Sequence, residues 1–289
     1  MTHVDRAGTP DARTQPRQAA STWLLAGPRT TLLFLRRDFS DRAMFRSSLV
    51  LDLGFGLLNL VSFLFISRVL QHPGGPVPGG AATYFDYVAV GLAYMLVVQA
   101  TCSQLLSRVQ EHQRSGTLEA LVASPVSPRL MAVGLGAYPT LLGLLRSIVY
   151  LAVAGAVLGM HVSGADWFGT VVVLILGSGA ALSIGIALAA CAVAYRPGAA
   201  AGKTVIVGLG FLSGAYFPVS ALPEPVPWVC AVLPTRMAID GLRAALAGGA
   251  WTLDALLLAG TTAVGLPLAA WAFARALRHA RRTGTLVRG

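Results

Sequence analysis

Charged residues are scarce in this 289-residue chain: they make up 12% of it, whereas a typical soluble domain contains about 25%. Hydrophobic residues account for 55%, and the mean hydropathy is +0.67. The length alone would allow two soluble domains, but so few charges could not cover their surfaces. The composition therefore predicts an integral membrane protein.

Cysteine is also rare. Cys102, Cys191 and Cys230 lie far apart, and none belongs to a C-x-x-C motif. This spacing predicts neither a disulfide framework nor a metal site. The five histidines all fall outside the long apolar runs, which argues against a membrane-embedded protease or transferase, since such enzymes need clustered histidine or carboxylate side chains at membrane depth.

Six apolar runs approach or exceed the length that a bilayer requires, which is about 20 residues per helix. They predict an all-α integral membrane fold with six transmembrane helices in a membrane domain that covers 47–274. The expected spans are about 47–66, 87–106, 130–158, 168–195, 204–217 and 253–273.

The positions of the basic residues predict the orientation. Most of the 22 lysines and arginines lie in the two termini and in the loops after the second and fourth runs, which share one side of the membrane. Loops rich in basic residues stay in the cytoplasm. We predict a multi-pass protein of the cell (plasma) membrane with both termini cytoplasmic, and the net charge of +10 then needs no nucleic acid partner.

The ends of the chain are more polar than the membrane domain. Residues 1–21 predict a disordered cytoplasmic tail, and 275–289 predict a basic cytoplasmic tail. Between 22 and 46, apolar residues recur at helical spacing beside arginines, which is typical of an amphipathic helix at the membrane interface. A cytosolic helix bound to a partner is the alternative. The residues that characterise this helix include Trp23, Arg36, Arg37 and Phe39.

The last outer loop contains an apolar stretch, 223–234, that is too short to span. Prolines at 223, 225 and 227 exclude one regular helix, so we predict a re-entrant or interfacial segment between the fifth and sixth spans. The following residues, 235–246, alternate apolar and charged side chains and predict an amphipathic helix whose polar face carries Arg236, Asp240 and Arg243.

The cytoplasmic segment between the second and third spans, 108–129, is too charged to enter the bilayer. Ser115 or Thr117 can cap a short helix there, and Pro125 ends it. Such a helix can dock a soluble partner, or it can be a structured loop without one. The pattern alone leaves both interpretations open.

Two motifs decide between them by resemblance. The stretch EHQRSGTLEALVASPVSP at 111–128 resembles the cytoplasmic loop of ABC-2 type exporter permeases, in the multidrug and antibiotic-resistance-like branch. GAYFPVSALP at 214–223, followed by LPTRMAIDGLR at 233–243, is similar to the end of the fifth span, the outer segment and the next helix of the same family.

This resemblance implies a dimer of permeases, either two copies of this chain or this chain with a paralogue. Each permease would dock a nucleotide-binding ATPase subunit, and ATP and Mg would bind to that subunit, with no cofactor on this chain. The 22–46 helix would lie beside the docking site. The implied coupling residues are Glu111, Arg114, Gly116, Thr117, Leu118, Glu119 and Pro125.

The chain itself lacks a phosphate-binding loop. The nearest match, GAAAGKT at 198–204, has three residues between its glycines, whereas G-x-x-x-x-G-K-[ST] requires four. We therefore expect that the chain is not an enzyme and that a separate subunit hydrolyses ATP.

Polar residues inside the apolar runs are candidates for the translocation pathway, because burying them in lipid is costly. Hydrogen bonds between helices are the alternative use. Two phenylalanines near the end of the fifth run join the list. The candidates are Asp52, Asn59, Gln99, Arg146, Phe211 and Phe217.

The substrate expected from the sequence is a hydrophobic or amphiphilic small molecule or a lipid, because aromatic residues in the apolar runs are few and scattered. Clustered aromatic rings would instead favour export of a lipid-linked polysaccharide. A secondary transporter with Asp52 as its proton site is an alternative from a different class.

Overall fold

The computed structural model describes residues 42–70, 83–115, 127–162, 164–195, 198–224 and 226–282. These ranges contain helices and connecting turns but no strand. In chain order the helices are α2 (Arg42–Leu70), α3 (Tyr84–Arg114), α5 (Pro128–Ala156), α6 (Trp167–Ala194), α7 (Gly198–Leu212), the 3₁₀ turn η2 (Val219–Ala221), α8 (Val226–Ala231), α9 (Pro234–Leu246) and α10 (Thr252–Arg282).

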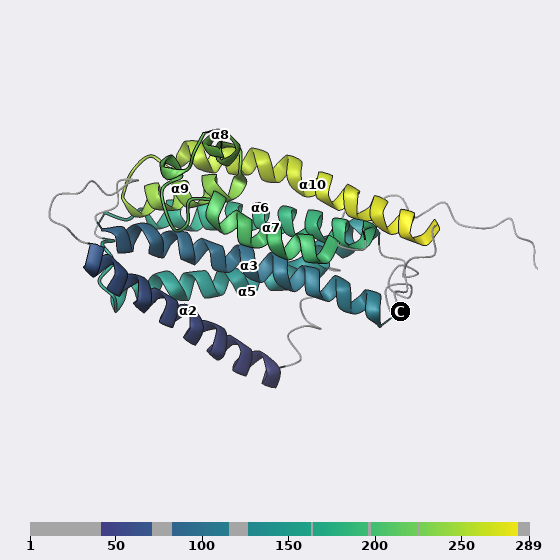
Figure 1. The fold of residues 1–289 in the computed structure, drawn as a ribbon, viewed down its shortest axis with the longest axis horizontal. Coiled ribbons are helices and arrows are strands. Elements are labelled where there is room, and N and C mark those ends of the chain that lie inside the picture. Colours follow the sequence, from purple (N-terminus) through teal and green to yellow (C-terminus); the bar gives the residue numbers. More distant parts are fainter. Residues whose placement is uncertain are drawn as a thin grey trace, which may run out of the picture.

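The long helices lie side by side in an elongated bundle, with α10 along one edge and α2 along the other (Figure 1). The most extensive packing joins α6 to α10, α3 to α5 and α3 to α6. In the most apolar stretch of α3, 78% of the residues are buried, compared with 22% for α10. Thus α3 is the central helix of the bundle, whereas much of the apolar stretch of α10 is exposed or half-buried.

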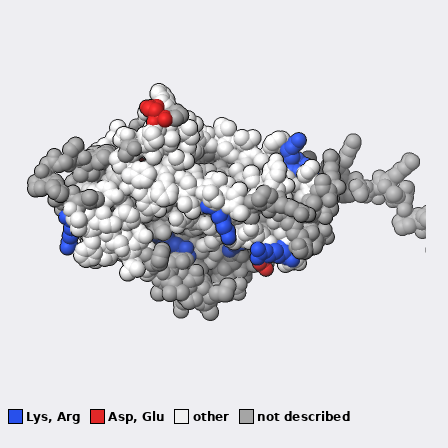
Figure 2. All heavy atoms as spheres, viewed as in Figure 1, with Lys and Arg blue, Asp and Glu red and all other residues white. Residues whose placement is uncertain are grey.

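The apolar surface of the bundle suits a lipid environment. Four helices, α3, α5, α6 and α10, are long and apolar enough to cross a membrane, and shorter apolar helices cover Gly56–Val69 and Ala200–Leu212. Uncharged side chains make up most of the face seen in Figure 2. The all-helical membrane fold is therefore confirmed as a class, while the number of six spans stays a prediction. Large exposed apolar side chains include Leu58, Phe65, Leu145, Ile175, Leu256, Val264 and Leu268.

Several helix ends differ from the apolar runs, and α3 continues to Arg114, beyond the run that ends at 106. Helix α7 stops at Leu212 and not at 217, because Gly214 adopts a left-handed conformation with φ of 73° that ends the helix. Helix α10 continues to Arg282, beyond the apolar run that ends at 273, so 275–282 form its last turns, while the basic cytoplasmic tail at 275–289 stays a prediction. Alanine and arginine favour helix strongly enough to extend it past the apolar run.

The N-terminal predictions lie largely outside the described residues. This applies to the 1–21 tail and to the interfacial helix with Trp23, Arg36, Arg37 and Phe39. Residues 42–46, which the sequence assigns to the end of that helix, are the first residues of α2.

Close approach between α3 and the segment after α7 depends on Gly91. A Cβ atom built on Gly91 would overlap the backbone of Ala215. We expect Gly91→Ala to lower the free energy of unfolding by about 1–3 kcal/mol, because backbone cannot move aside as a flexible side chain can. Gly208→Ala is the matched control, since nothing lies within 4 Å of its built Cβ and alanine favours helix. Thermal unfolding in detergent measures both, and equal stability of the two variants would refute the close approach.

Candidate functional site

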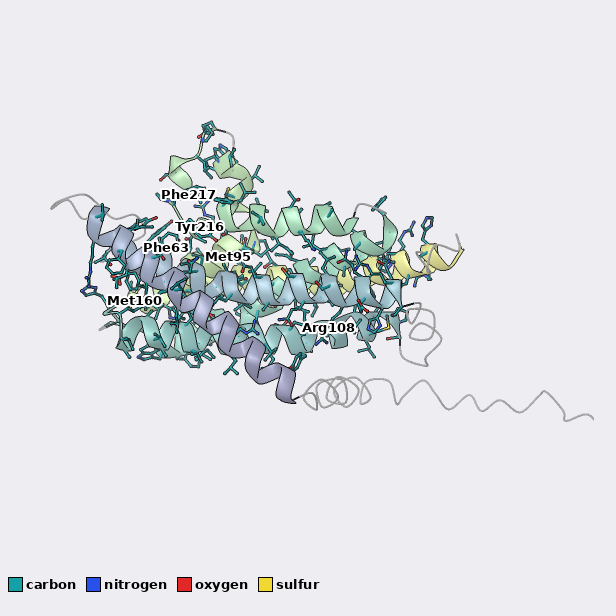
Figure 3. All side chains as sticks on the ribbon, turned by 60° about the horizontal axis from the view of Figure 1, so that its bottom comes forward. Phe63, Met95, Arg108, Met160, Tyr216 and Phe217 are labelled. Atoms are coloured by element: carbon teal, nitrogen blue, oxygen red, sulfur yellow. The ribbon has the colours of Figure 1, made fainter. Side chains whose placement is uncertain are left out.

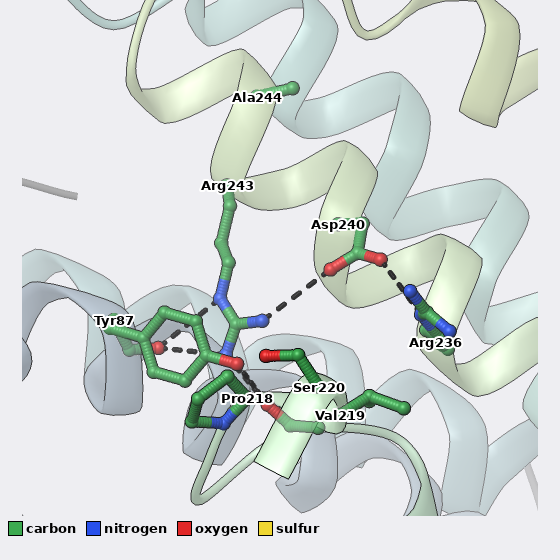
Figure 4. Close-up of a pocket in the computed structure, with 9 residues that line it drawn as sticks. Tyr87, Pro218, Val219, Ser220, Arg236, Asp240, Arg243 and Ala244 are labelled. Atoms are coloured by element: carbon green, nitrogen blue, oxygen red, sulfur yellow. Dashed lines mark hydrogen bonds and ion pairs between the residues drawn. The ribbon is translucent and has the colours of Figure 1, made fainter. Parts of the chain in front are cut away.

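A cavity of about 370 Å³ lies where α9, the first turn of α3 and the segment after α7 meet. Figure 4 shows that α9 directs charged side chains into it, while the segment after α7 closes the opposite side. Its lining residues are Tyr87, Gly214, Pro218, Val219, Ser220, Arg236, Asp240, Arg243 and Ala244.

Arg243 is the centre of this site, and only 7% of it is exposed. Its guanidinium donates to the backbone carbonyl of Tyr87, at 3.0 Å from Nη2 and 3.3 Å from Nε, and to the carbonyl of Gly214 at 2.9 Å. It also lies 3.5 Å from the centroid of the Tyr87 ring, a close cation–π contact. One side chain therefore joins α9 to both α3 and the segment after α7.

Asp240 links the two arginines of α9. Its carboxylate accepts from Arg236 Nε at 3.2 Å and from Arg243 Nη1 at 3.5 Å, and the Asp240 side chain is 45% exposed. Arg236 and Arg243 together carry one more positive charge than Asp240 neutralises, and the Ser220 side chain also lines the cavity. Because of this excess positive charge, the cavity can accept an anionic or hydrogen-bond-accepting group.

Aromatic side chains gather beside the cavity. Tyr216 contacts Phe211 and Phe63, with ring centroids 5.5 and 6.2 Å apart, and Phe211 contacts Phe217 at 6.2 Å. In Figure 3, Phe63, Tyr216 and Phe217 lie together at one end of the bundle, away from Arg108. We call Phe63, Phe211, Tyr216 and Phe217 the aromatic cluster. The expectation of scattered aromatic residues is therefore wrong, because the fold brings Phe63 on α2 to Tyr216, which lies in the segment after α7.

Two carboxylates fix the loops at the same end of the bundle. Asp86 accepts from the backbone N–H of Thr83 and of His161, and its Oδ2 lies 3.1 Å from His161 Nδ1. Asp166 accepts from the backbone N–H of Gly169 and from Trp251 Nε1 at 2.7 Å. These two hydrogen bonds lower the pKa of Asp166. The ionised carboxylate therefore stabilises the folded chain, and this contribution is lost as the pH falls through the lowered pKa.

The predicted coupling residues lie at the other end of α3. Glu111 and Arg114 are exposed in its last turn. The helix has 31 residues and is about 46 Å long, whereas the hydrocarbon core of a bilayer is about 30 Å thick. Its last turns can therefore project beyond the membrane. Gly116, Thr117, Leu118, Glu119 and Pro125 lie outside the described residues.

The predicted pathway residues do not form one group. Gln99 is exposed on α3, and Arg146 is buried on α5. The Asn59 Oδ1 atom is buried on α2 without a hydrogen-bond partner among the described residues. Phe211 and Phe217 do meet, in the aromatic cluster. The side chain of Asp52 lies outside the described part of the chain, although its backbone belongs to α2.

The sequence pattern predicts the helix that carries Arg243 but not the role of this residue. Helix α9 confirms the predicted amphipathic helix, yet Arg243 is buried and does not belong to an exposed polar face. The polar-face assignment was wrong for this residue because α9 packs against α3 and α6. Arginines in an outer loop run against the positive-inside bias, and this was the available signal. Tyr87 and Asp240 line the cavity with Arg243, and Tyr216 belongs to the aromatic cluster beside it.

Comparison with known protein families identifies a match over most of the chain. The family model described as ABC-2 type transporter matches residues 23–247. This range includes the cavity, the aromatic cluster and the exposed end of α3. No curated protein is significantly similar to the chain. Among the described residues, no group of three or more potential metal-ligating side chains lies together.

Proposed function

The chain belongs to the ABC-2 type transporter family, and from this premise we propose that it is the permease subunit of an ATP-driven exporter. It provides the translocation pathway across the membrane for a hydrophobic or amphiphilic small molecule, such as a drug, an antibiotic or a lipid. The observation that carries the proposal is the family match over most of a chain whose long helices are apolar.

The energy comes from a separate ATPase subunit, which binds ATP and Mg. This subunit docks on the cytoplasmic side, at the exposed end of α3 that carries Glu111 and Arg114, and on the loop that contains Gly116 and Glu119. A second permease, either a copy of this chain or a paralogue, completes the pathway. Both termini are cytoplasmic in this arrangement, as the distribution of arginine supports.

The cavity and the aromatic cluster support an amphiphilic substrate. Arg236 and Ser220 offer donors to a polar group, and Phe211, which is 50% exposed, offers an apolar surface nearby. The same cluster favours a second candidate substrate, a lipid-linked polysaccharide, because aromatic faces also stack on sugar rings. Both candidates use the same permease and ATPase.

Co-purification from native membranes tests the proposal. The tagged chain, extracted in mild detergent, should carry a soluble subunit with ATPase activity. Stimulation of that activity by cationic or anionic amphiphiles supports the first substrate class, and stimulation by lipid-linked oligosaccharide supports the second. A chain that is recovered alone under every mild condition, and that moves substrate in response to a proton gradient, would overturn the proposal in favour of a secondary transporter.

A further inference from the structure

A long groove runs between α6 and α10, away from the Arg243 cavity. Its first part, about 670 Å³, is lined by Tyr195, Trp271, Arg275 and Arg278 among small alanines. Its second part, about 390 Å³, continues past Gly265 and Leu268. Ala187 and Ala272 line both parts, so the two are continuous.

The sequence of α10 explains why one end of the groove is charged and the other apolar. The helix has no charged residue between Asp254 and Arg275, and it then carries Arg275 and Arg278, three positions apart and hence on one face. The Arg275 guanidinium lies 5.6 Å from the centroid of the Trp271 ring, within cation–π range. The two helices pack against each other, and the groove is lined mainly by the small side chains of alanine.

We propose that this groove binds an anionic phospholipid, with the phosphate at Arg275 and Arg278 and one acyl chain between α6 and α10. Gly265 and Arg275 are ten positions apart, about 15 Å along a helix, which is half of the roughly 30 Å hydrocarbon core. An acyl chain therefore reaches from the arginines to the bilayer midplane within the groove. This site is additional to the proposed export function and does not depend on the ATPase.

Charge and geometry favour a lipid over a second copy of the chain. A symmetric pair of copies that met through this face would bring Arg275 and Arg278 of each close to those of the other, and like charges repel. Most of the apolar stretch of α10 is exposed or half-buried, and acyl chains are the neighbours that such a surface favours in a membrane. A phospholipid satisfies both the cationic end and the apolar length.

Trp271 provides a probe at the site. The full chain is reconstituted in phosphatidylcholine vesicles that contain a minor fraction of phosphatidylglycerol with brominated acyl chains, because bromine quenches tryptophan fluorescence on contact. The signal of Trp271 is the difference between the wild type and Trp271→Phe. We expect stronger quenching of this signal by brominated phosphatidylglycerol than by brominated phosphatidylcholine at equal content.

Matched variants locate the two halves of the lipid. Arg275→Gln with Arg278→Gln should weaken phosphatidylglycerol binding about thirtyfold, roughly fivefold for each arginine. Arg129→Gln with Lys203→Gln removes the same charge from exposed positions on other helices and should leave binding unchanged. Ala187→Trp fills the groove at an exposed position and should reduce binding, whereas Ala152→Trp, exposed on α5, should not.

Two outcomes of the quenching experiment would overturn the proposed lipid site. Equal quenching by both brominated lipids would mean that the groove is ordinary lipid-facing surface, and the proposal fails. Absence of quenching by either lipid would mean that protein, such as a second copy, covers the groove, and the proposal also fails. Each result can be obtained whether or not an ATPase binds, so it is distinguishable from failure of the proposed function.

Discussion

Replacing Arg243 by methionine is expected to lower the free energy of unfolding by about 3 kcal/mol. The variant loses charge-assisted hydrogen bonds to two backbone carbonyls, those of Tyr87 and Gly214. Hydrogen bonds to a charged group contribute about 1.5–3 kcal/mol each, and the cation–π contact with Tyr87 is lost as well. Thermal unfolding of the purified chain, followed by tryptophan fluorescence, measures the effect.

Arg236→Met is the matched control for this prediction. Arg236 lies on the same helix, but its side chain is 31% exposed and pairs with Asp240, which is 45% exposed. Exposed pairs contribute about 0–1 kcal/mol, so the control should stay within that range. Arg243→Lys should fall between the two, because one ammonium cannot reproduce both the stacked and the forked geometry of guanidinium. Equal losses at 236 and 243 would refute the central role of Arg243.

The contrast between these two arginines explains what the sequence could predict. Periodicity placed both on the polar side of one helix, and α9 confirms that helix. Periodicity does not identify what packs against the helix. Arg243 bonds to Tyr87, which is 156 positions away, and this contact arises only when α9 lies against α3. The helix was predictable from local pattern, and the site was not.

Local pattern also predicted some helix ends and missed others. The apolar runs predicted α5 and α6 to within a few residues, because both helices end close to where their apolar side chains end. They missed the last turns of α3 and α10, where polar residues that favour helix continue it beyond the apolar stretch. The aromatic cluster was missed for another reason: Phe63 and Tyr216 are brought together by tertiary packing.

The continuity of α3 connects the two ends of the proposed permease. Tyr87 lies in its first turn and contacts Arg243, while Glu111 and Arg114 lie in its last. One uninterrupted helix therefore joins the cavity to the proposed docking surface. A rigid helix can transmit a displacement along its length. The docking end has to be tested directly.

Exchanging the two charges at that end, as Glu111→Arg with Arg114→Glu, is expected to lower recovery of the ATPase subunit at least about tenfold. Net charge is preserved, but each charge would face a partner group of the same sign, and such contacts cost several kcal/mol. Both side chains are exposed, so thermal stability should change by less than about 0.5 kcal/mol. Recovery is measured as ATPase activity per mole of tagged chain after mild extraction.

Glu224→Arg is the control for this exchange, because Glu224 is exposed beside α8 and distant in sequence from the α3 terminus. It should retain the ATPase fully. Retention of the subunit by the exchanged variant would move the docking surface away from the end of α3. Loss in both variants would point to a general effect of charge reversal. Selective loss at 111 and 114, with stability unchanged, would locate the docking surface there, because the control places a larger change of net charge at another exposed position.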